Sequence, residues 1–265
     1  MKVIITGSNG NLGSHIKEHA DFETISFSRD DWVNIDETFS HSANSIIHTA
    51  YDLKKSIYDN PDEVLSSNVI STVHFLKKCF EFKINNFIFI SSCSVYGDST
   101  NTSEDSKCTP ITVNGLTKLL NEKIIIEFCI KHNINYSILR VFNSYGGNDT
   151  FSVVSKLLKS ASTGSPFTLY NNGQAERDFI HIDDVAQIIC KLVNKNIKNE
   201  IINIGTGENI KIMNLVSEIE KKYGPMNIIN DSSENEIKSS HANIRKLNEI
   251  MDYEFATILQ HIRGL

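Results

Sequence analysis

The stretch MKVIITGSNGNLG, residues 1–13, decides the fold of this chain. Residues 2–6 form an apolar, β-branched run of strand length, three glycines follow at positions 7, 10 and 13, and the amphipathic segment 11–20 predicts a helix. A strand, a glycine loop and a helix in this order are typical of a βαβ unit that holds a nucleotide diphosphate on backbone amides and on the helix N-terminus. The spacing is GxxGxxG, not the plainer GxGxxG, but its place directly after a strand favours a dinucleotide site over an ordinary tight turn.

The composition of the 265 residues indicates a globular protein with small-molecule partners. Hydrophobic residues make up 40%, the net charge is −6, and no run of Lys or Arg is longer than a pair. This balance argues against nucleic acid and anionic membrane surfaces as partners. Because the chain opens directly into a strand and has no apolar run of membrane-spanning length, we expect a cytoplasmic protein.

Neither disulfides nor a metal site is expected. The five cysteines are scattered, odd in number and without a CxxC pair, which is typical of reduced thiols. His15 and His19 are one helical turn apart, but no third ligand is apparent and their helix face is expected to be solvated.

The rest of the chain alternates between strand and helix patterns, which predicts an α/β fold with a doubly wound parallel sheet of Rossmann type. Strands are expected at 24–28, 45–50, 86–91, 136–141 and 201–204, and helices at 61–79, 112–132, 151–160 and from the segment 177–184 to 193. After residue 143 the pattern loosens, with a hairpin-like segment at 169–173 and short helices and loops after 206. We therefore expect a dinucleotide-binding domain of residues 1–145 plus 178–206, and a small α/β substrate-binding lobe of residues 146–177 plus 207–265.

The end of the second strand bears on the choice of cofactor. Folds that bind NAD place an acid about twenty residues after the glycine loop, where it holds the ribose hydroxyls. This position holds Ser28, followed by Arg29. A small residue beside a cation suits a ribose 2′-phosphate, so NADP(H) is favoured over NAD(H). In the alternative, Arg29 is an ordinary loop residue and Asp30 or Asp31 serves NAD.

The helices expected at 61–79 and 112–132 carry apolar residues on more than one face. One face of each helix can pack on the sheet, which leaves the other without a partner inside one chain. We therefore expect a homodimer.

The chain resembles the extended short-chain dehydrogenases/reductases, in the NAD-dependent epimerase/dehydratase branch that acts on nucleotide sugars. The resemblance covers nearly the whole chain through motifs in order: the glycine loop, HTA at 48–50, NVIST from Asn68, FIFISSCSVYG from Phe87, LRVFNSYG from Leu139, RDFIHIDDVA from Arg177 and INIGTGENI from Ile202. It implies an oxidoreductase with a nicotinamide cofactor and a nucleotide-diphosphate sugar as its partner.

The resemblance also implies roles for individual residues. Ser92 would hydrogen-bond the reacting sugar oxygen, and Lys118 would hold the nicotinamide ribose. Substrate contacts would come from Cys93, Ser94, Asn143 and Arg177. The cofactor contacts would be Gly7, Asn9, Gly10, Asn11, Leu12, Gly13, Ser28, Arg29, Ile35, Asp36, Thr49, Ala50, Asn68 and Lys118.

Arg177 is placed by the resemblance near the diphosphate of the sugar nucleotide. The fork of donors on a guanidinium suits phosphate oxygens. The alternative for Arg177 is a structural salt bridge with Asp183 or Asp184.

The chain departs from the family pattern at the catalytic tyrosine, which is expected four residues before Lys118. Asn114 occupies this position. An amide neither donates nor accepts a proton at neutral pH, although it can hydrogen-bond a carbonyl oxygen. Tyr96, Cys93 and Tyr51 are the titratable side chains expected near the site that could replace the tyrosine.

Three functions remain open: NADPH-dependent reduction of a nucleotide-linked 4-keto-6-deoxysugar, C4 epimerisation with tightly held NAD, and binding of cofactor or sugar nucleotide by a catalytically impaired member. Family 4,6-dehydratases carry Thr-Asp-Glu at residues 92–94, where this chain has Ser-Cys-Ser, so elimination of water lacks its carboxylates. Segments 29–36 and 143–151 resemble the epimerase/reductase that makes GDP-fucose, but its Cys/His pair falls on Ser94 and Asn148. Reduction needs only a positioned hydride and a proton source, and is the reaction most compatible with these residues.

Overall fold

A six-stranded parallel sheet forms the centre of the computed structural model, which describes residues 1–40, 43–52, 58–234 and 236–264, without the side chains of residues 29, 30, 33 and 40. Its strands are β1 (Lys2–Thr6), β2 (Glu23–Phe27), β3 (Ser45–His48), β4 (Asn86–Ser92), β6 (Asn135–Val141) and β11 (Glu200–Ile204). The order across the sheet is β11-β6-β4-β3-β1-β2. The order reverses between β1 and β3, which confirms the predicted doubly wound Rossmann-type fold and puts its topological switch point there.

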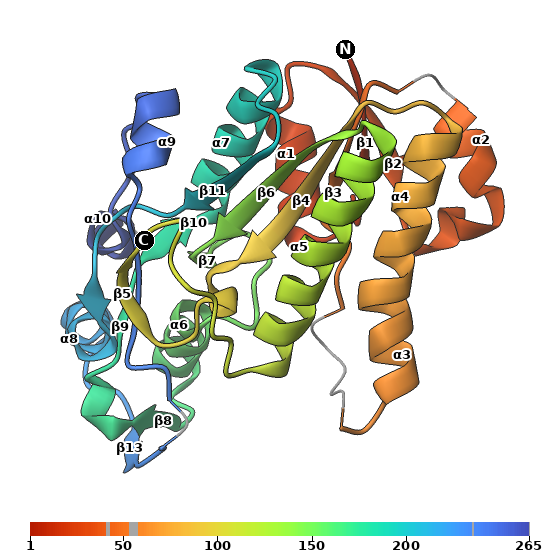
Figure 1. The fold of residues 1–265 in the computed structure, drawn as a ribbon. Helices are drawn as coiled ribbons and strands as arrows, with labels where there is room; N and C mark the ends of the chain where they lie inside the picture. Colours follow the sequence, from red (N-terminus) through yellow and green to blue (C-terminus); the bar gives the residue numbers. More distant parts are fainter. Residues whose placement is uncertain (41–42, 53–57, 235, 265) are drawn as a thin grey trace.

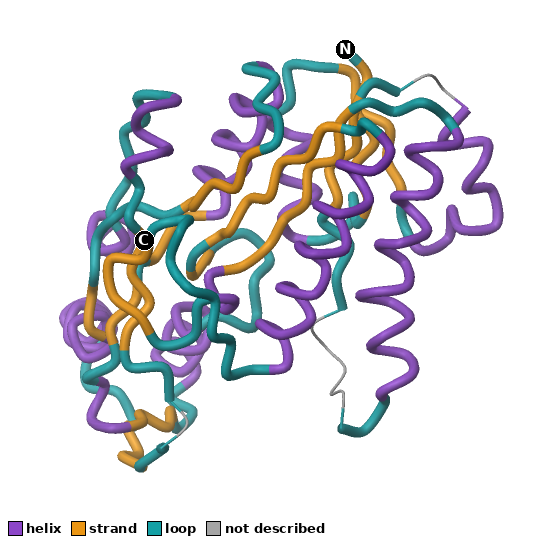
Figure 2. The backbone as a smooth tube through the Cα atoms, in the orientation of Figure 1, coloured by secondary structure: helices purple, strands orange, loops and turns teal. Residues whose placement is uncertain are grey.

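Helices cover both faces of this sheet. Side chains alternate along each strand, so Ile4 and Phe87 enter one core layer while Ile5 and Ile88 enter the other. Figures 1 and 2 show α4 (Ser71–Glu81) and α5 (Val113–His132) on one side of the sheet, with α1 (Asn11–His19) and α7 (Ile182–Asn194) on the other. The two apolar layers agree with the near-continuous hydrophobic strands in the sequence.

The helix predicted at 61–79 consists of three consecutive segments. These are α3 (Pro61–Leu65), the π-helical turn η2 (Ser66–Ile70) and α4. Asn68 lies in the π turn and is buried; its side chain accepts from the Asp52 backbone N–H at 2.6 Å and donates to the Asp52 carbonyl oxygen at 3.0 Å. The turn therefore fixes the loop that follows β3.

A second group of elements lies beside the carboxyl ends of the central strands and has an apolar core of its own. Leu157, Leu215 and Ile258 belong to this core. The elements are β5 (Ser99–Thr102), β7 (Asn143–Tyr145), α6 (Val153–Thr163), β8 (Phe167–Tyr170), β9 (Glu176–Arg177), β10 (Phe179–His181), β12 (Ile210–Lys211), α8 (Ile212–Tyr223), β13 (Ile228–Asp231), β14 (Ser239–Ala242) and α10 (Ile258–Gly264). The remaining short elements are η1 (Arg29–Asn34), α2 (Ile35–Ser40), η3 (Cys93–Val95), η4 (Asn171–Gly173) and α9 (Arg245–Ile250).

Three sequence-based expectations for this region are wrong. Segment 169–173 is no hairpin, because β8 pairs in parallel with the distant β13. The helix expected from 177–184 begins only at Ile182, since the residues before it form β9 and β10 and β10 pairs with β7. Residues after 206 include three strands as well as helices. Strands of two to four residues are too short to show a period in the sequence.

Candidate active site

An open cleft of about 2000 Å³ lies along the carboxyl ends of the central strands. Its lining includes the glycine loop, the ends of β3, β4 and β6, the start of α5, and Arg177 and Ser240 from the second group of elements. Pockets for one drug-sized ligand measure roughly 300–1,000 Å³. The cleft therefore has room for two ligands side by side, such as a dinucleotide and a second nucleotide-sized molecule.

The glycine loop presents bare backbone to this cleft. Gly7 has a φ of +68°, and a Cβ at Gly13 would overlap the Gly7 carbonyl oxygen. Helix α1 follows Gly10 with no side-chain cap and no acidic residue in its first turn. Its first N–H groups thus keep their capacity to bind an anion, which fits the diphosphate of a dinucleotide. Asn9, Asn11 and Leu12 line the same wall.

Asn11 connects the glycine loop to the segment after β7. Its Nδ2 donates to the Gly146 carbonyl oxygen at 3.0 Å, and its Oδ1 accepts from the Asn148 backbone N–H at 2.8 Å. Sequence reasoning missed this contact, because nothing in either segment marks the other as its neighbour.

The end of β2 is only partly placed. Ser28 lines the cleft, and its backbone N–H and hydroxyl both donate to Asp31 Oδ2, at 2.5 and 2.9 Å. The side chains of Arg29 and Asp30 lie outside the described residues. Ile35 and Asp36 do not line the cleft, and Asp36 forms an ion pair with Lys78 at 2.6 Å.

The end of β3 approaches the glycine loop closely. A Cβ on Gly7 would lie 2.9 Å from the backbone of Ala50, and Thr49 Oγ1 donates to the Thr6 carbonyl oxygen at 2.6 Å. Thr49 and Ala50 both line the cleft, whereas Asn68 lies behind it and holds the loop. The pKa of His48 is lowered to about 3 by burial, so this ring is a neutral part of the core.

A chain of hydrogen bonds joins the end of β4 to α5. Ser92 Oγ accepts from the hydroxyl of Ser94 at 3.0 Å and from its backbone N–H at 3.2 Å, and Asn114 Nδ2 donates to Ser94 Oγ at 3.4 Å. Gly115 permits the approach, because a Cβ there would overlap the Ser94 carbonyl oxygen. Asn114 Oδ1 is buried and has no hydrogen-bond partner in the described part of the chain, so it can accept a bond from a ligand.

Lys118 lies one turn further along α5 and is 7% exposed. Its Nζ donates to the Ile90 carbonyl oxygen at 2.7 Å and lies 4.0 Å from the centre of the Tyr51 ring. Burial lowers the pKa of Lys118 to about 7, against the opposing effect of the Glu122 carboxylate. Sequence reasoning named Tyr51 as near the site but gave no sign that its ring contacts Lys118.

The other two titratable candidates lie in different surroundings. Tyr96 is buried; its hydroxyl donates to Asn203 Oδ1 at 2.7 Å and accepts from Arg140 Nη1 at 2.8 Å, and it does not line the cleft. The expectation that Tyr96 lies near the reacting groups is therefore wrong. Cys93 lines the cleft beside Ser240, and burial raises the pKa of its thiol.

Two residues proposed for the substrate diphosphate belong to the second group of elements, Asn143 to β7 and Arg177 to β9. Asn143 Nδ2 donates to the Asp178 carbonyl oxygen at 2.9 Å, and Arg177 Nη1 donates to the Glu176 carbonyl oxygen at 2.8 Å. Both residues line the cleft. The carboxylates considered as alternative partners of Arg177 have other contacts: Asp183 lies near three histidines, and Asp184 accepts from the Tyr253 hydroxyl.

The histidine pair of α1 is less exposed than expected. The His15 side chain is 13% exposed, and the ring nitrogens of His15 and His19 lie 3.7 and 3.2 Å from Asp183 Oδ1. The expectation of a solvated face is wrong for His15, because α7 packs against α1. Among the described residues, no group of three or more His, Cys, Asp or Glu side chains is arranged to hold a metal ion. No helix in the same ranges is long and apolar enough to cross a membrane.

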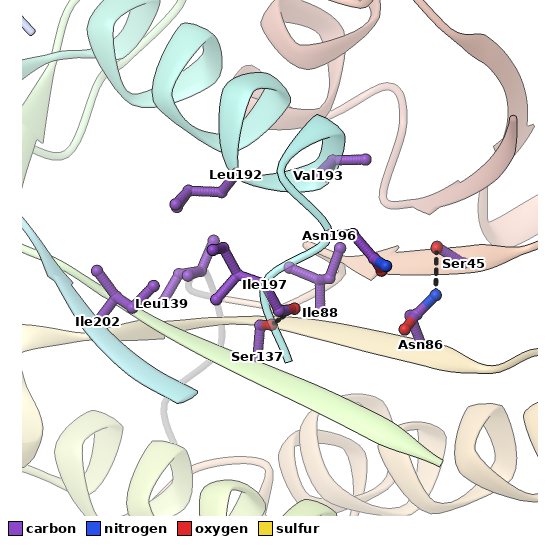
Figure 3. A pocket seen from close by; sticks show the side chains of 10 residues that line it. All are labelled: Ser45, Asn86, Ile88, Ser137, Leu139, Leu192, Val193, Asn196, Ile197 and Ile202. Atoms are coloured by element: carbon purple, nitrogen blue, oxygen red, sulfur yellow. Dashed lines mark hydrogen bonds between the residues drawn. The ribbon is translucent and has the colours of Figure 1, made fainter. Parts of the chain in front are cut away.

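A second cavity lies near the opposite ends of the strands, beneath the end of α7 (Figure 3). Its volume is about 10 Å³, which is space for one water at most. Ser45 and Asn86 at its edge already bond to each other at 3.2 Å. This cavity is a packing defect and holds no ligand-sized space.

Comparison with known proteins agrees with the fold. A model of the NAD dependent epimerase/dehydratase family matches residues 3–205. The Bacillus subtilis (strain 168) protein described as an uncharacterized UDP-glucose epimerase, YtcB, is 26% identical over 98% of this chain and 95% of its own. The Escherichia coli dTDP-4-dehydro-6-deoxyglucose reductase is 32% identical over 71% of this chain and 62% of its own. The UDP-glucuronic acid 4-epimerase from Bacillus cereus, solved with UDP-glucuronic acid and NAD, superimposes with a TM-score of 0.89 at 26% identity, over 98% of this chain and 96% of that one. The chain belongs to the NAD-dependent epimerase/dehydratase family.

Proposed function

We propose that this chain is an NADPH-dependent reductase of a nucleotide-linked 4-keto-6-deoxysugar. The observation that carries the proposal is the hydrogen-bonded chain Ser92–Ser94–Asn114 beside Lys118. None of these three linked side chains ionises near neutral pH, so they can hold a ketone oxygen but supply no base to deprotonate a sugar hydroxyl. The similarity to the Escherichia coli reductase supports the same reaction class.

The residues of the cleft divide between two ligands. The glycine loop and the α1 N-terminus would hold the diphosphate of the cofactor, and Lys118 its nicotinamide ribose. The bound nicotinamide would supply the hydride. Arg177 and Asn143 would hold the diphosphate of the sugar nucleotide. The second apolar core would support that wall as a substrate-binding lobe; most of this core comes from residues 146–177 and 207–265, with Tyr145 and Phe179 from outside these ranges.

A C4 epimerase that retains NAD is the second candidate, and the Asp31 carboxylate favours it. This acid lies against Ser28 at the end of β2, the region in which NAD-binding folds use an acid for the ribose. The similarity to the Bacillus cereus epimerase solved with NAD points the same way.

The test offers the purified protein NADPH with a panel of CDP-, dTDP-, GDP- and UDP-4-keto-6-deoxyhexoses and follows NADPH absorbance. We expect oxidation with at least one nucleotide sugar and loss of this activity in Lys118→Met. Interconversion of 4-hydroxy sugars without added cofactor, and no NADPH oxidation, would identify the epimerase instead. Cofactor binding in calorimetry without either reaction would identify a non-catalytic member.

A further inference from the structure

We propose that Tyr51 supplies the proton donor that position 114 lacks, so that the phenol of the site comes from the loop after β3 instead of from helix α5. The inference rests on the proposed reduction and names the acid for it. It derives from where the structure places the three titratable side chains relative to Lys118.

Tyr51 is the phenol that contacts Lys118. The centre of its ring lies 4.0 Å from Lys118 Nζ, a cation–π distance, and both residues line the cleft. The loop position is fixed from behind, because Asn68 bonds both backbone groups of the adjacent Asp52. The backbone beside Tyr51 is therefore fixed by hydrogen bonds, and the Tyr51 side chain lines the cleft.

The hydroxyl of Tyr51 lies next to the helix turn that carries Asn114. It is 2.5 Å from Thr117 Oγ1, and Thr117 in turn donates to the carbonyl oxygens of Val113 at 3.0 Å and Asn114 at 3.1 Å. When the single Thr117 hydroxyl hydrogen bonds to one of these carbonyls, the Tyr51 hydroxyl donates to Thr117 Oγ1. The ketone oxygen of a substrate bound at Ser92 and Ser94 would offer this proton an alternative acceptor.

The protonation state of Tyr51 suits an acid. Burial raises the pKa of its phenol, so the hydroxyl keeps its proton at neutral pH. Because almost no phenolate is then present at neutral pH, Tyr51 has little capacity to remove a proton from a sugar hydroxyl, which agrees with reduction more than with epimerisation. Tyr96 is held by Arg140 and Asn203 away from the cleft, and the Cys93 thiol lies against Ser92 and Ser240.

The proton and electron balance of the step is complete with these groups. Bound NADPH would supply the hydride for the new C–H bond at the carbonyl carbon and would be oxidised to NADP⁺. The C=O π bond breaks, its oxygen takes the Tyr51 hydroxyl proton, and the ketone becomes a secondary alcohol. The phenolate then regains a proton from solvent.

The decisive variant is Tyr51→Phe, which keeps the ring on Lys118 and removes only the hydroxyl. We expect single-turnover reduction to fall about 10²–10⁴-fold, the usual contribution of a positioned acid, while NADPH affinity in calorimetry stays the same. Tyr223→Phe, at the exposed end of α8, is the matched control and should not change the rate. Reduction by Tyr51→Phe at the wild-type rate, together with a gain in Asn114→Tyr, overturns the proposal in favour of a vacated acid position.

Nitration of tyrosines by tetranitromethane tests the position of Tyr51 independently of turnover. We expect mass spectrometry to find Tyr51 nitrated in the cofactor-free protein and protected once NADP⁺ and the nucleotide sugar are bound, whereas Tyr223 reacts equally in both. Equal nitration of Tyr51 with and without these ligands overturns the proposal. Absence of reduction by the wild-type protein would reject the proposed function, and nitration would still decide whether Tyr51 contacts the ligands.

Discussion

Removing one partner of the buried ion pair between Arg140 and Glu122 should strongly destabilise this fold. Both side chains are buried, at 4% and 1% exposure. Arg140 donates to the two Glu122 oxygens at 2.7 and 3.1 Å and to the Tyr96 hydroxyl at 2.8 Å. Arg140→Met would remove the guanidinium and leave the Ser91 hydroxyl, at 2.5 Å, as the hydrogen-bond donor to the Glu122 carboxylate in the described part of the chain. Leaving one partner of a buried pair alone costs about 3–5 kcal/mol, against a total stability of roughly 5–15 kcal/mol.

Urea unfolding measures this cost. With an m-value of about 2–3 kcal/mol/M, the midpoint of Arg140→Met should fall by roughly 1–2.5 M. Arg245→Met is the matched control, because this guanidinium is 84% exposed in its pair with Glu249 and should change stability by at most about 0.5 kcal/mol. Arg140→Met/Glu122→Leu should be more stable than Arg140→Met, since no lone charge stays buried. A double variant destabilised by the sum of the two single changes would refute the reasoning.

The remaining predictions concern the cofactor, the assembly and pH. NADPH should bind more tightly than NADH, and Arg29→Ala should weaken NADPH alone by roughly 1.5–3 kcal/mol, about ten- to over a hundredfold in calorimetry; equal wild-type affinities would contradict this. The protein should sediment as a dimer at micromolar concentration through α5, where Leu116 is 54% exposed. Leu116→Glu should then sediment as a monomer while Ile229→Glu, on the exposed strand β13, does not. The pKa of Lys118 is about 7 in the folded protein, below its value in the unfolded chain. Between these two pKa values the unfolded chain binds more protons than the folded protein, so the free energy of unfolding should rise with pH. This rise, about 2 kcal/mol from pH 7 to 9, should be absent in urea unfolding of Lys118→Met.

The central sheet could be predicted because each of its elements carries a local signal. The β-branched pattern of residues 2–6 predicts a strand, and the glycines after it predict the turn into a helix. The pairing of β8 with β13 could not be predicted, since its partner lies far along the chain and neither strand has more than four residues. Tertiary pairing, not local propensity, forms these strands.

The candidate site could likewise be predicted only in part. Ser92 and Lys118 could be named from motif spacing, and the structure places both at the cleft. The contact between Tyr51 and Lys118 could not be predicted, because it depends on β3 and β4 being neighbours in the sheet. Tyr96 is close to Ser92 in sequence, yet the turn η3 directs its ring into a buried network.

The π-helical turn η2 accommodates one extra residue in the helical segment between Pro61 and Glu81. A π turn contains one residue more than an α turn. Removing one residue from 66–70 would let an unbroken α-helix form there, and the residues after it would keep nearly the same face toward the sheet, because the wider turn already absorbs the extra residue. Phe75 would therefore stay in the core, while the Asn68 side chain, inside the π turn, would lose its hydrogen bonds to Asp52. A deletion in the regular α-helical part, with no wide turn to absorb it, would instead rotate the residues after it by about 100° about the helix axis.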